Sequence, residues 1–323
     1  MERPKISIII PIYNAGKFID RCFDSILNQT LQDFEIIAVN DASQDTSLEI
    51  LQKYTSDSRI VLVDKKENEG PMKARESGYK IAKGDFFMFA DGDDYMPEDA
   101  FEVLYNEIMK RRGDVVIGDI AYCPLRGEQV LYSNALPYGS DKSGIWKALL
   151  NKKLRHNLCG RIYNRRLFDE YEYSCYMNQN HGEDMILFYE LRNHASGVFC
   201  IDYVAYYYCQ NVMSSTQKRM SDKALKQYLF AAQWWGDFLL NVGADHEIVN
   251  KDALDTASYL LQHNYDVKIV LEKFPNFASL TSWKTIRSYF SIGKTVHLCA
   301  LLHCCLYRYL IYNLVLIKRM FKI

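Results

Sequence analysis

The sequence has no excess of charge of either sign and no disulfide framework. Its 323 residues hold 39 Lys and Arg against 40 Asp and Glu, a formal net charge of −1. This balance excludes the global basic field that nucleic-acid-binding proteins use. The 9 cysteines form no Cys-x-x-Cys pair, which favours reduced thiols in a cytoplasmic protein over disulfides or a zinc site. The N-terminus lacks the long apolar core of a signal peptide, and we find no internal repeat.

What is present is an alternation of strand and helix patterns in the first part of the chain. Runs such as "KISIIIPIY" and "FEIIAVND" are typical of buried strands, and amphipathic stretches between such runs predict helices. We expect strands within 5–13, 34–41, 59–65, 85–91 and 114–122, and helices within 15–29, 46–54, 72–83 and 97–111. This order predicts an α/β fold with a mainly parallel sheet flanked by helices.

The second part of the chain is less regular. We expect a hairpin near Gly127, a helix over 142–150, a helix opening in "NHGEDMILFYELRNH", a Tyr-rich strand "VFCIDYVAYYYC" and a helix over 221–240. No linker-like composition separates these segments. We therefore expect a main domain over 1–215, which would carry the catalytic site, and a helical C-terminal extension over 216–323.

An acidic cluster follows the fourth expected strand, in "FFMFADGDDYMPEDA". Asp-Gly sequences also form ordinary turns, and an acidic residue can cap the helix that follows. Carboxylates this close repel one another, however, so a cation among them is favoured. Ligands of parallel α/β sheets bind beyond the carboxyl ends of the strands, where Asp41, the "ENEGP" loop and this cluster all fall.

Five motifs occur in the order seen in family 2 glycosyltransferases: "SIIIPIYN", "VNDAS", "NEGPMKARESG", "ADGDD" and "GEDM". The chain resembles that family over roughly residues 4–210. The resemblance implies the GT-A fold, a nucleotide-sugar donor with UDP favoured, and transfer with inversion to a hydroxyl group. By this resemblance the nucleotide-sugar site comprises Pro11, Tyr13, Asn14, Asp41, Asn68, Gly70, Arg75, Asp91 and Gly92. Asp41 would accept the imide N–H of the base, although Asn40 stands where the family has a second acid.

The "DGDD" stretch resembles the Asp-x-Asp metal site of the family. The implied cofactor is Mn²⁺ or Mg²⁺, with Asp93 as the main ligand and Asp91 and Asp94 assisting. Such ions prefer hard oxygen ligands and stabilise charge on a departing diphosphate. How the roles divide among the three carboxylates is not readable from the sequence.

The "HGEDM" motif resembles the family's Glu-Asp motif, which implies that Asp184 is the catalytic base, with Glu183 as second choice. The alternative is that both residues only cap a helix, whose N-terminus also stabilises a carboxylate. Arg161 and Arg165 of "CGRIYNRRLF" would touch the diphosphate or the acceptor, or else form a solvated basic turn. The Tyr-rich strand would line an acceptor pocket or belong to the core, and we favour the core.

The C-terminal tail has no acidic residue after Glu272, and its segment "VHLCALLHCCLYRYLIYNLVLI" is mostly apolar. Arg308 near the middle of that segment disfavours a membrane span. We expect either a helix packed on the main domain or peripheral membrane contact through 294–323, which would place the protein at the inner face of the cell membrane. A lipid-linked saccharide acceptor in bacterial surface polysaccharide synthesis would suit the second possibility.

Two other functions fit a similar scaffold. A sugar-phosphate nucleotidyltransferase would need a Gly-rich phosphate loop after the first strand, whereas "IPIYNAGKFI" has a single glycine. A non-catalytic nucleotide- or saccharide-binding module would keep the same site without turnover. We expect an enzyme, a metal-dependent glycosyltransferase.

Overall fold

The computed structural model describes residues 3–124, 128–132, 157–173, 182–211, 221–241, 254–256 and 259–261. The chain forms two compact units, Met1–Val212 and Met213–Ile323. The assignment of a catalytic domain to 1–215 and of an extension to 216–323 stays a prediction. Of the second unit, helix α8 (Asp222–Asn241) is described, as expected for 221–240. The expected helix over 142–150 and the tail over 294–323 lie outside the described residues.

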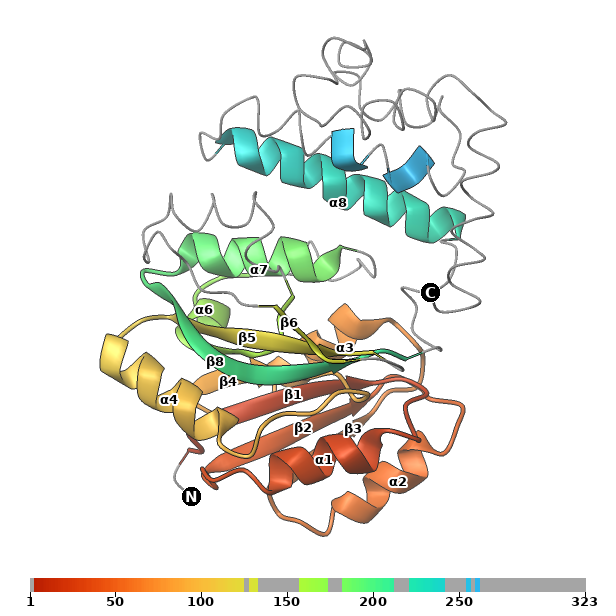
Figure 1. Cartoon of the computed structure of the whole chain (residues 1–323). Coiled ribbons are helices and arrows are strands. Elements are labelled where there is room, and N and C mark those ends of the chain that lie inside the picture. Colours follow the sequence, from red (N-terminus) through yellow and green to blue (C-terminus); the bar gives the residue numbers. More distant parts are fainter. Residues whose placement is uncertain are drawn as a thin grey trace. The chain divides into compact units, whose positions relative to one another are not determined.

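The first unit is built on one mixed sheet (Figure 1). Its described strands run in the order β3-β2-β1-β4-β7-β5-β6, and β8 pairs with β5. The bounds are β1 Ile6–Ile12, β2 Phe34–Asn40, β3 Ile60–Asp64, β4 Phe86–Phe89, β5 Val115–Cys123, β6 Val130–Tyr132, β7 Arg161–Asn164 and β8 Val198–Cys209.

The first four strands pair in parallel, as the alternating pattern predicts. The next pairings are of both kinds: β7 lies antiparallel between β4 and β5, β6 is antiparallel to β5, and β8 is parallel to β5. The expected hairpin near Gly127 corresponds to the β5–β6 pair, although residues 125–127 themselves are not described. Four of the seven pairings between described strands are parallel, so the expected mainly parallel sheet is confirmed, with the antiparallel pairings of β6 and β7 making it mixed.

Helices cover both faces of this sheet. Helices α1 (Ile19–Leu27) and α2 (Ser47–Tyr54) lie on one face together with α4 (Ala100–Arg111). Helices α3 (Pro71–Tyr79), α6 (Arg166–Asp169) and α7 (Glu183–His194) lie on the other face (Figure 1). Successive residues of β4 point to opposite faces, so Phe86 packs on Tyr105 of α4 and Phe87 packs on Phe168 of α6.

The central strands form the core. Ile6, Ile8, Ile9 and Ile10 of β1 have no exposed surface, as expected of a parallel strand covered on both faces. Each such side chain contributes about 1.5–3 kcal/mol on burial. Gly78 of α3 allows the helix to approach β1, because a Cβ there would lie 2.5 Å from Cγ2 of Ile9. The core thus holds β1, β2 and β4 firmly, and their carboxyl ends define the floor of the site.

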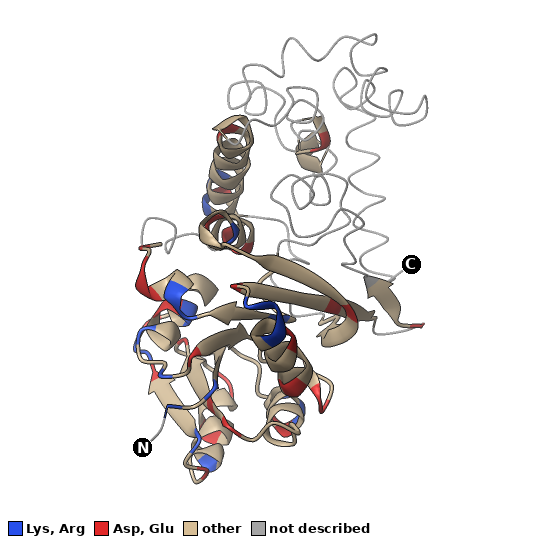
Figure 2. Ribbon diagram, turned by 90° about the vertical axis from the view of Figure 1, so that its left-hand side faces the viewer, with Lys and Arg blue, Asp and Glu red and all other residues tan. Residues whose placement is uncertain are grey.

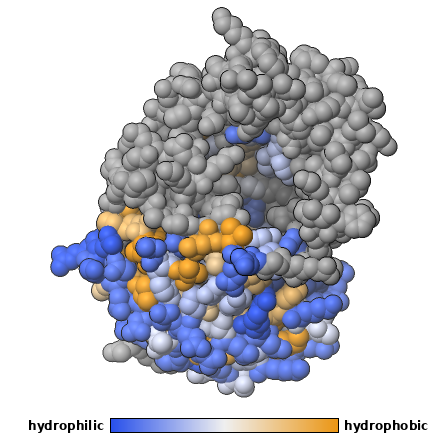
Figure 3. Space-filling view, viewed as in Figure 1, coloured by the Kyte–Doolittle hydropathy of each residue, from blue (hydrophilic) through white to orange (hydrophobic). Residues whose placement is uncertain are grey.

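The surface of the described chain is mixed. Lys and Arg alternate with Asp and Glu along the ribbon without forming a basic face (Figure 2). In the space-filling view the described surface is largely hydrophilic, with a limited apolar area (Figure 3). No helix within the described ranges is long and apolar enough to cross a membrane.

Candidate functional site

The site lies where β1, β2 and β4 end. Asp41 directly follows β2, and its backbone N–H donates to the carbonyl of Ile12 at the end of β1 (2.8 Å). Asp91 comes shortly after β4, and a Cβ on the neighbouring Gly92 would lie 3.2 Å from Cγ1 of Ile12. The predicted residues Pro11, Asp41, Asp91 and Gly92 are therefore brought together, as the sheet topology requires.

The end of β1 is fixed by cross-loop hydrogen bonds. Asn14 takes a left-handed conformation (φ 51°), which Asn tolerates better than most residues. Its N–H donates to Oγ of Ser43 (3.1 Å), and its Oδ1 accepts from the N–H of Gln44 (2.7 Å). Tyr13 next to it is 48% exposed, so its ring remains available to a ligand above the strand ends.

Asp41 organises the loop before α3. Its carboxylate accepts from the N–H of Gly70 (2.7 Å) and of Glu69 (3.2 Å) and pairs with Nζ of Lys65 (2.9 Å). Asn68 donates to the carbonyl of Asp41 (3.3 Å). Gly70 has φ 95°, a conformation that side chains disfavour. Since the side chain of Asp41 is 3% exposed, its contact with a base stays a prediction, and its visible role is to hold the loop.

The three carboxylates of "DGDD" have different surroundings. Asp94 is 1% exposed and accepts from the N–H of Cys209 (2.7 Å) and the hydroxyl of Tyr206 (2.8 Å). Asp93 is half-buried and accepts from Nδ2 of Asn211 (3.1 Å). Asp91 keeps 33% of its side-chain surface. Asp91 and Asp93 therefore face a ligand more openly than Asp94 does.

Burial and mutual repulsion disfavour the charged forms of the carboxylates in this cluster and so raise their pKa values. Burial, followed by the charges of Asp91 and Asp93, raises the pKa of Asp94 to about 8. Burial and the charge of Asp91 also raise the pKa of Asp93 above its ordinary range. Both shifts disfavour the charged forms of Asp93 and Asp94, so a cation bound beside them would be stabilised.

Arg75 connects the acidic cluster to the second acidic motif. Its Nη2 lies 2.9 Å from Oδ1 of Asp91, and its Nη1 lies 3.0 Å from Oδ1 of Asp184. The Arg75 side chain is 4% exposed, and the two carboxylates raise its pKa against the opposing effect of burial. Residues 16 and 109 positions away in sequence are thus joined by one guanidinium group.

Glu183 and Asp184 begin α7, as the "HGEDM" motif predicts. Gly182 before them has φ 79°, so the chain turns sharply into the helix. Burial and the neighbouring Asp184 raise the pKa of Glu183 to about 8. Burial also raises the pKa of Asp184, while Arg75 lowers it. Of the two, only Asp184 is held by a cation within the described residues.

Arg161 and Arg165 of "CGRIYNRRLF" are buried and partly buried rather than fully solvated. Arg161 begins β7, is fully buried, and its guanidinium lies 3.9 Å from the ring centre of Phe188 in α7. Arg165 donates to the carbonyl of Ala82 (2.9 Å), and its N–H bonds the carbonyl of Asp85 ahead of β4. Its backbone therefore lies at the end of β4 away from Asp91. A contact of Arg161 or Arg165 with the diphosphate or the acceptor stays a prediction.

The sequence interpretation missed the contribution of β8. The Tyr206 hydroxyl accepts from the N–H of Asp91 (2.9 Å) and donates to Asp94. Arg21 of α1 donates to the carbonyl of Asp93. Burial raises the pKa of Tyr206 well above its ordinary value. A signal existed in the Tyr-rich strand, but nothing in it distinguishes the one hydroxyl that meets the acidic loop.

The residues present fit a divalent cation only in part. No group of three or more His, Cys, Asp or Glu side chains within the described ranges converges to hold a metal ion. Asp91 and Asp93 offer hard carboxylate oxygens, and Mg²⁺ in phosphate-handling sites is often bound through one or two carboxylates with the phosphates completing the shell. The site thus fits an ion that arrives with a phosphorylated ligand.

Comparison with known proteins gives consistent results. Residues 7–172 match the family model described as Glycosyl transferase family 2. The chain is 30% identical over 176 residues to "Glycosyltransferase GlyA" of Streptococcus pneumoniae, covering 51% of this chain and 25% of that protein. It is 40% identical over 120 residues to "Poly(ribitol-phosphate) beta-glucosyltransferase" of Bacillus spizizenii, covering 36% and 19%. The chain thus spans a quarter or less of the length of these two relatives.

Among solved structures, the chain resembles S. aureus TarS 1-349 in complex with UDP-GlcNAc. The TM-score is 0.69 at 16% identity, and the match covers 98% of this chain and 92% of that one. At this identity the likeness concerns the fold. It confirms the GT-A fold expected from the motifs.

Proposed function

The chain belongs to glycosyl transferase family 2, and from that premise we propose that it transfers a sugar from a UDP-sugar to a hydroxyl group, with inversion and with a divalent cation. The observation that carries the proposal is the ion-pair bridge Asp91–Arg75–Asp184. It joins the residues expected to bind the donor's diphosphate end with the residue expected to activate the acceptor. An in-line displacement needs these two functions on opposite sides of one sugar carbon.

Asp184 is the proposed base. A base must be deprotonated at the working pH to take the acceptor proton as the new bond forms. Burial and the neighbouring Asp184 raise the pKa of Glu183, which disfavours its charged form, and no cation pairs with it in the described part of the chain. Burial raises the pKa of Asp184, but Arg75 opposes this shift by favouring its charged form. The environment therefore favours Asp184 over Glu183 for this role.

The donor would lie across the ends of β1, β2 and β4. Tyr13 is exposed and directly follows Ile12, whose carbonyl accepts from the N–H of Asp41, which supports a base site there. Asp93 and Asp91 would hold Mn²⁺ or Mg²⁺, and Asp94 would support them from below through Tyr206 and β8. When bound, the ion would neutralise negative charge on the departing nucleoside diphosphate.

The proposed acceptor is a saccharide or a lipid-linked saccharide in bacterial surface polysaccharide synthesis. The Bacillus spizizenii relative is named a poly(ribitol-phosphate) beta-glucosyltransferase, which supports a cell-surface polymer. The UDP-GlcNAc bound to S. aureus TarS supports a UDP-sugar donor. A cytoplasmic location at the inner face of the membrane, with contact through 294–323, rests on the composition of that tail.

A donor panel tests the proposal. We expect UDP release from one UDP-sugar in the presence of Mn²⁺ or Mg²⁺ and an acceptor, and its loss with a chelator. Asp93→Asn should abolish release. Asp33→Asn should not, because Asp33 is an exposed carboxylate just before β2, at the amino ends of the strands and away from the site. Full activity of Asp93→Asn, or release of pyrophosphate from a nucleoside triphosphate and a sugar phosphate, would contradict the assignment.

A further inference from the structure

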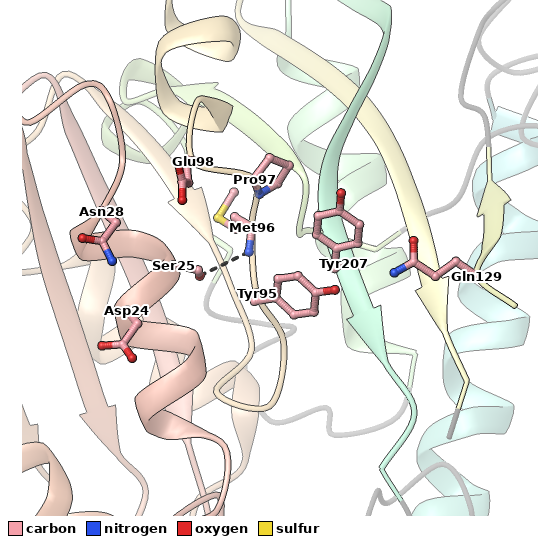
Figure 4. Close-up of a pocket in the computed structure, with 9 residues that line it drawn as sticks. All are labelled: Asp24, Ser25, Asn28, Tyr95, Met96, Pro97, Glu98, Gln129 and Tyr207. Carbon is pink, nitrogen blue, oxygen red and sulfur yellow. Dashed lines mark hydrogen bonds between the residues drawn. The ribbon is translucent and has the colours of Figure 1, made fainter. Parts of the chain in front are cut away.

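A cavity lies beside the acidic loop, outside the proposed donor site. It has a volume of about 420 Å³ and is lined by residues of α1, of the segment after Asp94 and of β8, and by Gln129 just before β6 (Figure 4). Its lining includes Asp24, Asn28, Tyr95, Glu98, Gln129 and Tyr207. None of these residues belongs to the donor, metal or base assignments above.

Two tyrosines form the centre of the cavity. The rings of Tyr95 and Tyr207 stack with centroids 4.5 Å apart and planes 13° apart. Their backbones are bridged, since the N–H of Tyr207 donates to the carbonyl of Tyr95 (2.9 Å). Both residues are only half-buried. The guanidinium of Arg21 also lies over the Tyr95 ring, 5.2 Å from its centre. The pair thus forms an ordered aromatic surface that keeps contact with solvent, the amphipathic type of surface that Tyr provides in binding sites.

Polar side chains surround this aromatic centre (Figure 4). Asp24 and Asn28 extend from α1 on one side of the tyrosines, and Gln129 lies on the other side. The side chains of Asp24, Asn28, Glu98 and Gln129 form no hydrogen bond with another residue of the described part of the chain. An aromatic surface with a few convergent donors and acceptors is the composition expected of a small-ligand site.

The charge of the lining restricts the ligand. The described lining holds the carboxylates of Asp24 and Glu98 but no Lys or Arg. These two carboxylates disfavour an anionic ligand. Arg21, whose guanidinium lies 5.2 Å from the centre of the Tyr95 ring, donates to the carbonyl of Asp93 in the acidic loop. A neutral polyhydroxylated ligand fits, since its hydroxyl groups donate to carboxylates and its apolar C–H faces pack on aromatic rings.

We propose that this cavity is a binding subsite for a neutral saccharide segment, occupied by a part of the glycan acceptor or product away from the reacting sugar. The proposal rests on the glycosyltransferase function above and adds to it the class of glycan handled. The position supports it: Tyr95 follows Asp94 directly, and Tyr207 follows Tyr206, whose hydroxyl bonds both Asp94 and the N–H of Asp91. A saccharide bound to Tyr95 and Tyr207 would therefore lie next to the acidic loop, because each tyrosine directly follows a residue that belongs to that loop or bonds to it.

Direct binding tests the subsite without turnover. The full chain is titrated with neutral tetrasaccharides of glucose, galactose, mannose and N-acetylglucosamine, followed by saturation-transfer NMR, with a glucuronate-containing tetrasaccharide as the anionic comparator. We expect at least one neutral tetrasaccharide to bind and the anionic one to bind more weakly. Loss of the aromatic contact in Tyr207→Ser should weaken binding about 3- to 10-fold.

Tyr208→Ser is the matched control, because Tyr208 is the next residue of β8 and stacks on Tyr122, outside the cavity lining. UDP binding is measured in parallel on every variant. If Tyr207→Ser does not fold, the exposed pair Asp24→Ala and Asn28→Ala replaces it, with the same expected loss.

The results separate the two proposals. Neutral saccharide binding that falls in the cavity variants and persists in Tyr208→Ser supports the subsite. Binding that is equal in wild type and cavity variants, stronger for the anionic probe, or absent for every neutral probe while UDP binds, overturns it. Absent UDP binding with intact saccharide binding would contradict the proposed donor site and leave the subsite supported.

Discussion

Replacing Arg75 by Met should uncouple the two acidic motifs while keeping a side chain of similar length. Removing one partner of a fully buried ion pair costs about 3–5 kcal/mol. Arg75 is 4% exposed, but Asp91 and Asp184 keep 33% and 31% of their side-chain surface, so water screens the carboxylates that remain. We therefore expect a loss of about 2 kcal/mol, roughly half of the buried value. For a unit of this size that corresponds to a fall in Tm of about 4–8 °C.

The assay is thermal unfolding by far-UV circular dichroism, combined with the pH profile of UDP release. Because Arg75 lowers the pKa of Asp184, its removal should raise that pKa and move the acidic limb of activity to higher pH. Arg75→Lys keeps the charge but cannot span two carboxylates with one planar fork, so it should restore part of the stability. In the double variant Arg75→Met, Asp184→Asn, the stability losses should not add. A Tm within about 1 °C of wild type for Arg75→Met, or strictly additive losses, would refute the bridge.

Three further outcomes are expected. Asp184→Asn should lower kcat by about 10²- to 10⁴-fold with UDP affinity kept, whereas Glu183→Gln should reduce it far less; the reverse order in steady-state kinetics would exchange the roles. Tyr206→Phe should cost about 1–3 kcal/mol, because it leaves a buried carboxyl and an N–H without their hydroxyl partner, and an unchanged urea midpoint would contradict this. Arg166 and Ser196 lower the pKa of Asp114; its stabilisation is therefore present above the unfolded pKa and lost as pH falls below about 4, so acid titrations of wild type and Asp114→Asn should converge at low pH.

The first half of the sheet could be predicted from the sequence, because its strands have a clear apolar pattern. A parallel strand covered on both faces must be apolar throughout, and "SIIIPI" and "FEIIAV" are. The helix expected over 15–29 begins instead at Ile19. The N–H groups of Ala15 and Gly16 bond Oγ of Ser47 (2.9 Å) and Oδ2 of Asp45 (3.0 Å), so a turn precedes the helix. Such a competition between local turn and helix is decided by residues about thirty positions away.

The burial of strand β7 could not be predicted from its sequence pattern. A segment with three arginines in six residues, "RIYNRR", looks solvated. In the fold Arg161 instead sits against the ring of Phe188, and the alternate Ile162 has no exposed surface. The motif residues of the site were predictable because their order and spacing resemble a family. Their supports from β8 were not, since the hydroxyl of Tyr206 reaches Asp94 across 112 positions of sequence.

The hydrogen bonds between β8 and the acidic loop also determine where the chain can be truncated for expression. The matched family region ends at residue 172, before α7 and β8. A shortened protein designed on that boundary would retain the "DGDD" motif yet omit Asp184, the hydroxyl of Tyr206 and the amide of Asn211 that contacts Asp93. Expression fragments and chimaeras should therefore be cut after Val212, where the first compact unit ends.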